Sequence, residues 1–261
     1  LHFQDVYAAG RIIHLQPMHW ENDWPIIGVN KEGNDYGEPV MEYRKPDIGK
    51  TSEELADSKK YPVCEPDTTD EFDTPKMMPQ WQWNANYDDS WYETKTDVYG
   101  NKSENGSYIK LNAVLTTPLR PVGDYRNLLI QKWPAPEFTC VTKMSLYGLK
   151  DGDYAGIVSL GMDYISLGIA RNAGEYAIRT VRGKQSFDCE VAYTDEKIDN
   201  EPIDSKKFTD DMKTIYLKYT VKRTGSKQTK EMALLVDNVP VEEASLEISF
   251  DGNNYQNAVS Y

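Results

Sequence analysis

The stretch that decides the fold is 10–28, which reads Gly-Arg-Ile-Ile-His-Leu-Gln-Pro-Met-His-Trp-Glu-Asn-Asp-Trp-Pro-Ile-Ile-Gly. Ile13 and Leu15 alternate with polar neighbours, which is typical of a half-buried β-strand. Glu21-Asn22-Asp23 has the composition of a turn. The apolar run 24–29 is short enough to be a second strand. The stretch therefore predicts two short strands joined by a polar turn.

The composition excludes several classes of protein. The chain has 261 residues, 39% of them hydrophobic and 27% charged, as expected of a globular protein with one large β domain or two smaller ones. A net charge of −13 argues against nucleic acid as a partner, because phosphate binding needs clustered Lys and Arg. No apolar run reaches the roughly 18 residues of a membrane-spanning helix, so no membrane partner is expected. The N-terminal residues lack an initiator Met and a signal-peptide pattern, which leaves export open.

The cysteines and two of the histidines give no metal-binding pattern. Cys64, Cys140 and Cys189 are not at metal-ligand spacing, and one disulfide among them stays open, although an odd count favours none. Cys140 falls mid-strand by pattern and is expected to be a small buried hydrophobe. His14 and His19 have no partner at metal-ligand spacing, so we expect them to be hydrogen-bonding residues.

From Asp70 onward, short runs of β-type residues recur between Gly, Asn and Asp. The predicted strands are 107–114, 127–132, 138–147, 154–160, 164–170, 176–181, 187–193, 214–222 and 232–236. The clearest alternation places Ile215, Leu217, Tyr219 and Val221 on one face of 214–222. Turn signals occur at Asp151-Gly152, Asn172-Ala173-Gly174, Thr224-Gly225-Ser226 and Asp251-Gly252. Evenly spaced strands without a helical period predict an all-β sandwich or barrel.

The order of residues in the opening stretch is more specific than its apolar periodicity. Gly-Arg, His-Leu-Gln-Pro and Asp-Trp-Pro follow one another within 10–28. In this order they resemble the last blade of the five-bladed β-propeller of family 43 glycoside hydrolases, the β-xylosidases and α-L-arabinofuranosidases. The resemblance implies that residues 1–43 are the end of that blade. Residues 44–69 are polar and hold three prolines, which indicates a linker.

Residues 70–261 carry a second resemblance. It rests on Asp70-Glu71-Phe72-Asp73, on Trp81-Gln82-Trp83-Asn84, on 127–138 and on Gly152-Asp153-Tyr154-Ala155-Gly156. These segments resemble the concanavalin-A-like β-sandwich (jelly roll) that is appended to family 43 propellers. The implied fold class is an all-β sandwich preceded by the last strands of a β-propeller. After Ser249-Phe250-Asp251-Gly252 the family continues with a Trp- and Gly-rich hairpin, so we expect this sandwich to lack its final strands.

The resemblance implies an enzyme that hydrolyses xylan- or arabinan-derived glycans with inversion, on plant cell-wall oligosaccharides or polysaccharides, and that is secreted or periplasmic. Inverting glycosidases place two carboxylates across the scissile bond. In the family these acids lie in earlier blades, so no catalytic residue is assigned here and the chain alone is expected to be inactive. Asp5, Glu21, Asp23 and Glu38 lie in turn-like surroundings and are not expected to be catalytic.

Two residues of the opening segment map onto the family's substrate pocket. Arg11, in Gly-Arg-Ile, resembles an arginine that lines the substrate subsite, where a guanidinium can donate paired hydrogen bonds to hydroxyls. His2, in His-Phe-Gln-Asp, resembles a histidine that reaches the propeller axis, where some members hold a metal. The alternatives are a strand arginine at the surface and a solvated terminal histidine. No metal ligand is assigned to this chain, and no cofactor is required.

Two features of the sandwich segment suggest ligands without specifying them. Trp81 and Trp83 alternate by two and so share a face, which suits stacking against a sugar ring. Paired tryptophans in a sandwich more often fill the core or a domain interface, and we expect some of these rings to be interfacial. A structural Ca²⁺ bound by oxygens around Glu71 and Asp73 is the other hypothesis, although the spacing matches no closed calcium motif.

The sequence also leaves two alternative functions open and predicts self-association of the opening segment. The main rival is a stand-alone carbohydrate-binding sandwich module, and a hydrolase built on the sandwich alone is disfavoured because the alternation offers no paired carboxylates. If neighbouring blades are absent, 10–28 exposes strand edges together with Trp20, Trp24 and Ile26. We therefore expect partners in the missing propeller blades, and self-association through this surface when they are absent.

Overall fold

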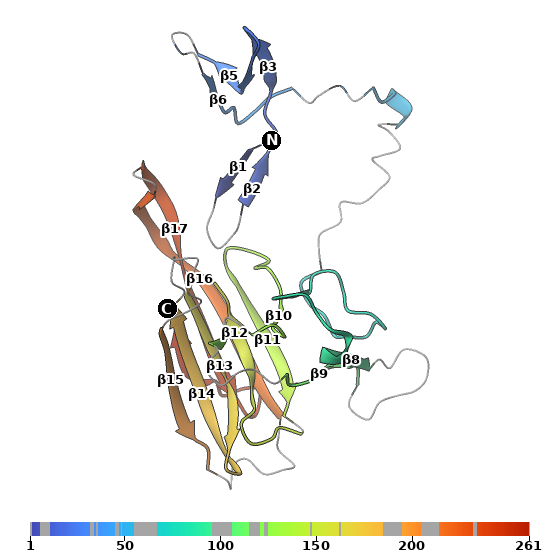
Figure 1. Ribbon diagram of the computed structural model, residues 1–261, viewed down its shortest axis with the longest axis vertical. Helices are drawn as coiled ribbons and strands as arrows, with labels where there is room; N and C mark the ends of the chain where they lie inside the picture. The colour runs from blue at the N-terminus through green and yellow to red at the C-terminus, as the bar shows by residue number, and fades with distance from the viewer. Residues whose placement is uncertain are drawn as a thin grey trace. The chain divides into compact units, whose positions relative to one another are not determined.

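The computed structural model describes residues 2–5, 11–31, 34, 36–44, 47, 49–54, 67–95, 106–114, 121–122, 125–146, 148–161, 163–184, 195–204, 214–231 and 234–260. The chain divides into two compact units, Leu1–Pro66 and Asp67–Tyr261. Strands dominate both units (Figure 1). The prediction of an all-β protein is confirmed. No helix in the described ranges is long and apolar enough to cross a membrane.

The first unit consists of three antiparallel strand pairs among its described residues. They are β1 (His2–Asp5) with β2 (Arg11–His14), β3 (Met18–Glu21) with β4 (Trp24–Ile27), and β5 (Val29–Asn30) with β6 (Gly37–Glu38). Asn22 and Asp23 join β3 to β4 with φ values of 49° and 63°, the left-handed conformation that a two-residue hairpin turn requires. The predicted turn is confirmed. The stretch 10–28 nevertheless holds three strands, where two were predicted.

The apolar side chains at the start of this stretch are more exposed than predicted. Ile13 is 72% exposed and Leu15 is 67% exposed, so the half-buried strand expected here is wrong. The reason is that β2 pairs only with β1 in the described part of the chain, and a two-stranded ribbon covers neither of its faces. The Gln16 side chain instead ties the stretch down: its amide donates to the Val40 carbonyl at 2.9 Å and accepts from the Val40 amide at 2.8 Å.

The second unit contains two four-stranded antiparallel sheets. The β16 sheet has the order β11 (Phe138–Ser145), β16 (Thr214–Glu231), β17 (Leu234–Ser249), β18 (Gln256–Ser260). The β13 sheet has the order β12 (Tyr154–Ser159), β13 (Asp163–Asn172), β14 (Glu175–Lys184), β15 (Asp195–Pro202). Two smaller pairs lie beside them: β7 (Gln82–Trp83) with β10 (Leu129–Ile130), and β8 (Tyr92–Lys95) with β9 (Tyr108–Leu111).

The core lies between the two sheets. The buried cluster combines side chains of the β13 sheet with those of the β16 sheet: Ile165, Leu167, Ile169 and Ile178 with Ile215, Leu217, Tyr219, Val221, Ala244, Leu246, Ile248 and Val259. The face predicted for 214–222 is therefore confirmed. Full burial of an aliphatic side chain contributes about 1.5–3 kcal/mol. This cluster is what makes the second unit a sandwich.

The strands β16 and β17 extend past the rest of their sheet. The strand β11 pairs with 214–221 and β18 with 245–248, so 222–231 and 234–243 pair only with each other, as the projecting hairpin in Figure 1 shows. The turn predicted at Thr224-Gly225-Ser226 is wrong, because this tripeptide lies inside β16. The pairing of β16 with β17 shifts register between Arg223 and Gly225, so the tripeptide forms an irregularity within the strand. Gly225 has a φ of 144° there.

The predictions for the cysteines and for the strands after 184 have different outcomes. Cys140 lies mid-strand in β11, as predicted, but its side chain is exposed because β11 is the edge strand of its sheet. Cys64, Cys189 and the predicted strand 187–193 lie outside the described residues. The strand β15, which has the polar sequence Asp-Glu-Lys-Ile-Asp-Asn-Glu-Pro, was not predicted because it shows no apolar alternation.

Candidate functional surfaces

Arg11 and His2 lie at opposite ends of the β1–β2 ribbon. Arg11 is paired with Asp5, and His2 is paired with His14. Two residue pairs lie between them, so the two ends are roughly 10 Å apart along the ladder. The Arg11 side chain is exposed, and its Cζ lies 5.0 Å from the centre of the Phe3 ring, a cation–π contact. The ribbon therefore presents a guanidinium stacked on an aromatic ring at one end, and the assignment of Arg11 and His2 to substrate stays a prediction.

The carboxylates of the first unit make local polar contacts. Glu21 accepts a hydrogen bond from the Asn30 amide at 3.0 Å. Glu38 pairs with Lys31 and accepts from the Asn34 amide at 3.0 Å. These groups hold the β3–β4 and β5–β6 loops together. Such contacts give Glu21 and Glu38 a structural role in these loops.

No metal site is formed by the side chains that the structure describes. Within that part of the chain, no three His, Cys, Asp or Glu residues converge. His19 faces only Glu21, at 3.8 Å, and both are exposed. Glu71 and Asp73, where a calcium site was hypothesised, are also exposed. The neighbouring Asp70 carboxylate already accepts two hydrogen bonds at 2.7 Å, from the amide of Phe72 and from the indole of Trp81.

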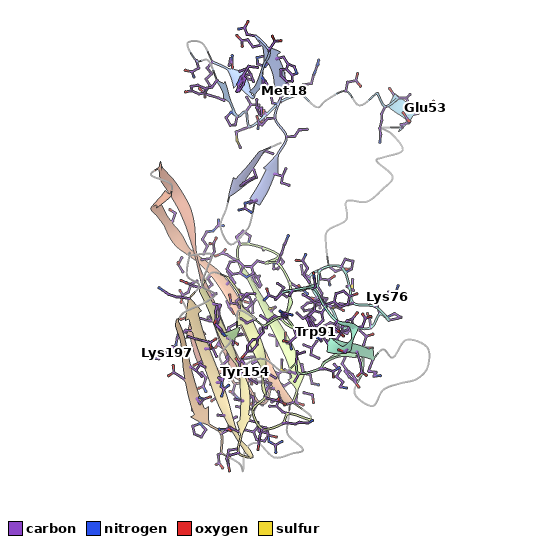
Figure 2. The ribbon with its side chains drawn as sticks, in the orientation of Figure 1. Met18, Glu53, Lys76, Trp91, Tyr154 and Lys197 are labelled. Atoms are coloured by element: carbon purple, nitrogen blue, oxygen red, sulfur yellow. The ribbon has the colours of Figure 1, made fainter. Side chains whose placement is uncertain are left out.

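The aromatic residues of 67–95 form two separate contacts beside the sandwich. The Trp81 ring stacks on Phe72, with centroids 5.7 Å apart. The Trp83 ring meets Trp91 at 5.5 Å and Tyr92 at 5.7 Å (Figure 2 labels Trp91). All five rings are half-buried. Both rings therefore pack against other aromatic residues, the alternative to sugar stacking, and each has different partners.

The Gly-Asp-Tyr-Ala-Gly motif builds the outer face of the β13 sheet. Asp153 closes the turn before β12 by accepting from the Lys150 amide at 2.8 Å. Tyr154 then reaches across the sheet to Ser166, with 2.5 Å between their oxygens. Its glycine, Gly156, faces Gly168 on β13. An added Cβ on Gly168 would lie 2.1 Å from the carbonyl oxygen of Ala155, so the two backbones approach too closely for any other residue.

A second tyrosine crosses the same face. Tyr164 lies over Gly183, because a Cβ added there would be 2.1 Å from the Tyr164 ring. Its hydroxyl donates to Glu196 at 2.7 Å, and Glu196 also accepts from the Val122 amide at 2.8 Å. The sequence offered no signal for this network, since Glu196 lies in the unpredicted strand β15. Beside this polar network the outer face carries a second buried cluster, formed by Val122, Tyr164 and Val181.

The fold and these surfaces define a protein of the concanavalin-A-like β-sandwich class, carrying short strand pairs ahead of the sandwich. A family model for the β-xylosidase C-terminal concanavalin A-like domain matches residues 69–261. The chain belongs to this family, the C-terminal sandwich of family 43 glycoside hydrolases. The predicted fold class is confirmed.

Relatives and solved structures agree with this family. A putative β-xylosidase of Xylanibacter ruminicola is 31% identical over 173 residues, which is 66% of this chain and 28% of that protein. A β-xylosidase of Formosa agariphila is 42% identical over 82 residues, which is 31% of this chain and 12% of that protein. The chain thus matches less than a third of the length of either curated relative.

The structural likeness extends over both units. A family 43 glycoside hydrolase engineered to display endo-xylanase and exo-arabinofuranosidase activity superposes with a TM-score of 0.60 at 21% identity, covering 98% of this chain and 43% of that one. A bifunctional GH43-CE protein of Bacteroides eggerthii gives a TM-score of 0.57 at 21% identity, covering 98% of this chain and 27% of that one. At this identity the likeness shows the fold alone.

Proposed function

We propose that this chain is the C-terminal part of an enzyme that hydrolyses xylan- or arabinan-derived glycans with inversion of the anomeric centre. The observation that supports this most is the family match over 69–261, together with a family 43 fold likeness that covers 98% of the chain. In this proposal the sandwich braces the propeller and the rim of its active site. The catalytic acids lie on a segment outside these 261 residues.

The proposal places the acids elsewhere because of the geometry that inversion requires. An inverting enzyme needs one protonated carboxyl group to protonate the leaving oxygen and one carboxylate to activate water, about 6.5–9.5 Å apart across the scissile bond. Glu21 and Glu38, two carboxylates of the first unit, are held by amides and a lysine in local loops. They are therefore not proposed as this pair.

Arg11 is proposed to bind substrate. Its guanidinium lies 5.0 Å from the centre of the Phe3 ring, and this contact restricts the positions that its N–H donors can take. In the complete propeller these donors would bind sugar hydroxyls. His2 is proposed to approach the same pocket from β1. Replacing Arg11 by Lys in the longer enzyme should raise KM and lower kcat/KM, while Arg44→Lys, outside the strands, should leave both unchanged.

Three further expectations accompany the proposal. The enzyme is proposed to be secreted or periplasmic, where plant cell-wall glycans are met. A structural Ca²⁺ near Glu71 and Asp73 also remains a hypothesis, which a shift of the thermal unfolding midpoint on adding Ca²⁺ or a chelator would test. The exposed apolar residues of β3 and β4 are proposed to contact the neighbouring blades of the propeller.

The second candidate is a stand-alone carbohydrate-binding module. What favours it is that the second unit has its own buried core between two sheets. The test is calorimetry with neutral xylo-oligosaccharides, combined with hydrolysis assays on the chain extended at its N-terminus by the upstream coding sequence. Hydrolysis by the extended protein without neutral-sugar binding by the chain alone supports the enzyme. Neutral-sugar binding by the chain, with no hydrolysis after extension, supports the module.

A further inference from the structure

A cross-strand row on the outer face of the β13 sheet contains an unusual arginine. The register aligns Gly156 of β12, Gly168 of β13, Arg179 of β14 and Asn200 of β15 in one row. These positions alternate with the core-facing aliphatic residues of β13, so the row lies on the side of the sheet away from the core. Arg179 is half-buried, while Gly156 and Asn200 are exposed.

The Arg179 side chain is held in place on two sides. Its Nε donates to the Asn200 carbonyl oxygen Oδ1 at 2.9 Å. Its Cζ lies 5.6 Å from the centre of the Tyr154 ring, the residue labelled in Figure 2. These contacts use one N–H and one face of the guanidinium. The two terminal nitrogens, Nη1 and Nη2, have no hydrogen-bond partner among the residues that the structure describes.

Tyr154 does not neutralise this cation. Ser166 donates its only hydroxyl proton to the Ile157 carbonyl at 2.9 Å, so the Tyr154 hydroxyl must be the donor to Ser166. Burial also raises the pKa of Tyr154 well above its ordinary value. The ring beneath Arg179 is therefore a neutral phenol whose proton is already committed.

Glu196, an acid on the same face, already accepts hydrogen bonds from other groups. Its donors are the Tyr164 hydroxyl and the Val122 amide. In the described part of the chain, Arg179 forms no ion pair. A half-buried guanidinium usually has a carboxylate partner, because burying an unpaired charge is costly. The absence of one is more notable in a chain with a net charge of −13.

Tyr154 reaches from β12 to Ser166 on β13 and its ring lies against Arg179, so the β12 side of the row is covered and Gly168 there is buried. The open surface beside Arg179 therefore lies toward β15, where Asn200 is exposed. On β15, Ile198 and Pro202 share the outer face with Asn200 and are exposed, Ile198 by 46%. The apolar side chains of Ile198 and Pro202 next to the Arg179 guanidinium suit a sugar ring that carries both C–H groups and a charged group.

We propose that Arg179 and Asn200 form a subsite for the carboxylate of a uronate-bearing oligosaccharide. The Nη1 and Nη2 groups donate two parallel hydrogen bonds to the carboxylate. The Asn200 amide nitrogen donates to a ring hydroxyl, while Ile198 and Pro202 contact the C–H face. This inference rests on the proposed glycan substrate class, and it assigns to the sandwich the recognition of acidic side groups on the same glycans.

The test is calorimetry on the 261-residue chain with an acidic xylo-oligosaccharide and with the same oligosaccharide after reduction of its carboxyl group. The acidic form should bind, and the reduced form should bind roughly tenfold or more weakly, as the loss of charge-assisted hydrogen bonds implies. Arg179→Met should abolish the difference. The matched control is Arg182→Met, which removes an exposed arginine from the opposite face of the same strand.

A second variant guards against misfolding of the first. Asn200→Asp places a carboxylate next to the guanidinium, so it should weaken binding of the acidic sugar while leaving the unfolding midpoint unchanged or higher. Equal binding of acidic and reduced sugars, unchanged binding by both variants, or acetate binding as tightly as the sugar would each overturn the proposal. Hydrolysis of neutral oligosaccharides by the extended enzyme is independent of Arg179, so the two proposals fail separately.

Discussion

The hydroxyl groups of Ser159 and Tyr219 lie 2.8 Å apart and join the two sheets of the sandwich through its core. Ser159 ends β12 in one sheet, and Tyr219 is central in β16 of the other. Both are buried. The Tyr219 ring also packs edge-on against Phe138 at 5.3 Å, so the phenol is fixed on its apolar side as well as its polar side.

This contact predicts measurable coupling between the sheets. Ser159→Ala and Tyr219→Phe each remove one partner and keep the packing shape. In a double-mutant cycle by urea unfolding, the coupling free energy should be about 1 kcal/mol, the usual net value of a hydrogen bond. Strictly additive single-mutant effects would show that the hydroxyls do not stabilise each other.

Tyr154 makes the stability of the second unit fall at alkaline pH. Because burial raises its pKa in the folded protein, the unfolded chain loses this proton first, near the ordinary tyrosine pKa of about 10. The contribution is complete below that pH and is lost as the pH rises above it. Tyr154→Phe should flatten the decline of the urea midpoint between pH 8 and 11, whereas Tyr87→Phe, at a 56% exposed tyrosine, should not.

Gly168→Ala should destabilise the β13 sheet severely. The added Cβ would meet the Ala155 carbonyl oxygen at 2.1 Å, and this neighbour is backbone, which cannot rotate away. Gly174→Ala is the comparison, because the space around Gly174 is open and only its φ of 80° opposes a side chain. We expect a loss of about 1 kcal/mol for Gly174→Ala and a larger one for Gly168→Ala. Similar thermal unfolding midpoints for the two variants would contradict the close approach.

The first unit should associate when the chain is studied alone. Met18, Trp20 and Ile27 are 54%, 67% and 47% exposed on one face of the β3–β4 hairpin, a concentration of apolar surface that usually marks an interface. Light scattering should detect oligomers, and the double substitution Trp20→Ser with Ile27→Ser should lower their mass. Met41→Ser serves as the control, since Met41 is 94% exposed but lies outside this face. A monomer at every concentration tested would refute this expectation.

Sequence patterns predicted the strands that have one face in solvent and the other face buried in the core. The alternation of Ile215 to Val221 correctly identified the core face of 214–222, because the sheet is buried on that side, although β16 continues to Glu231. The strand β15 was missed because it is an edge strand of mostly polar residues, held by pairing with β14 and not by burial. Cys140 was wrongly expected to be buried for a related reason: strand propensity does not reveal which strands lie at an edge.

The candidate subsite shows what sequence patterns could not anticipate. Gly152-Asp153-Tyr154-Ala155-Gly156 marked the region, but its role depends on partners far along the chain: Ser166, Gly168 and Arg179. Only the register brings Arg179 beside Asn200. Arg11, in contrast, was assigned to the substrate pocket from its sequence motif. The structure adds its contact with Phe3.

The most direct test of the central claim is the hydrolysis of xylo- and arabino-oligosaccharides by this chain and by the same chain extended through the upstream coding sequence, with the product anomer followed by NMR. We predict no hydrolysis by the chain alone and hydrolysis with inversion by the extended protein. Hydrolysis by these 261 residues alone, or a product that retains its configuration, would contradict the account.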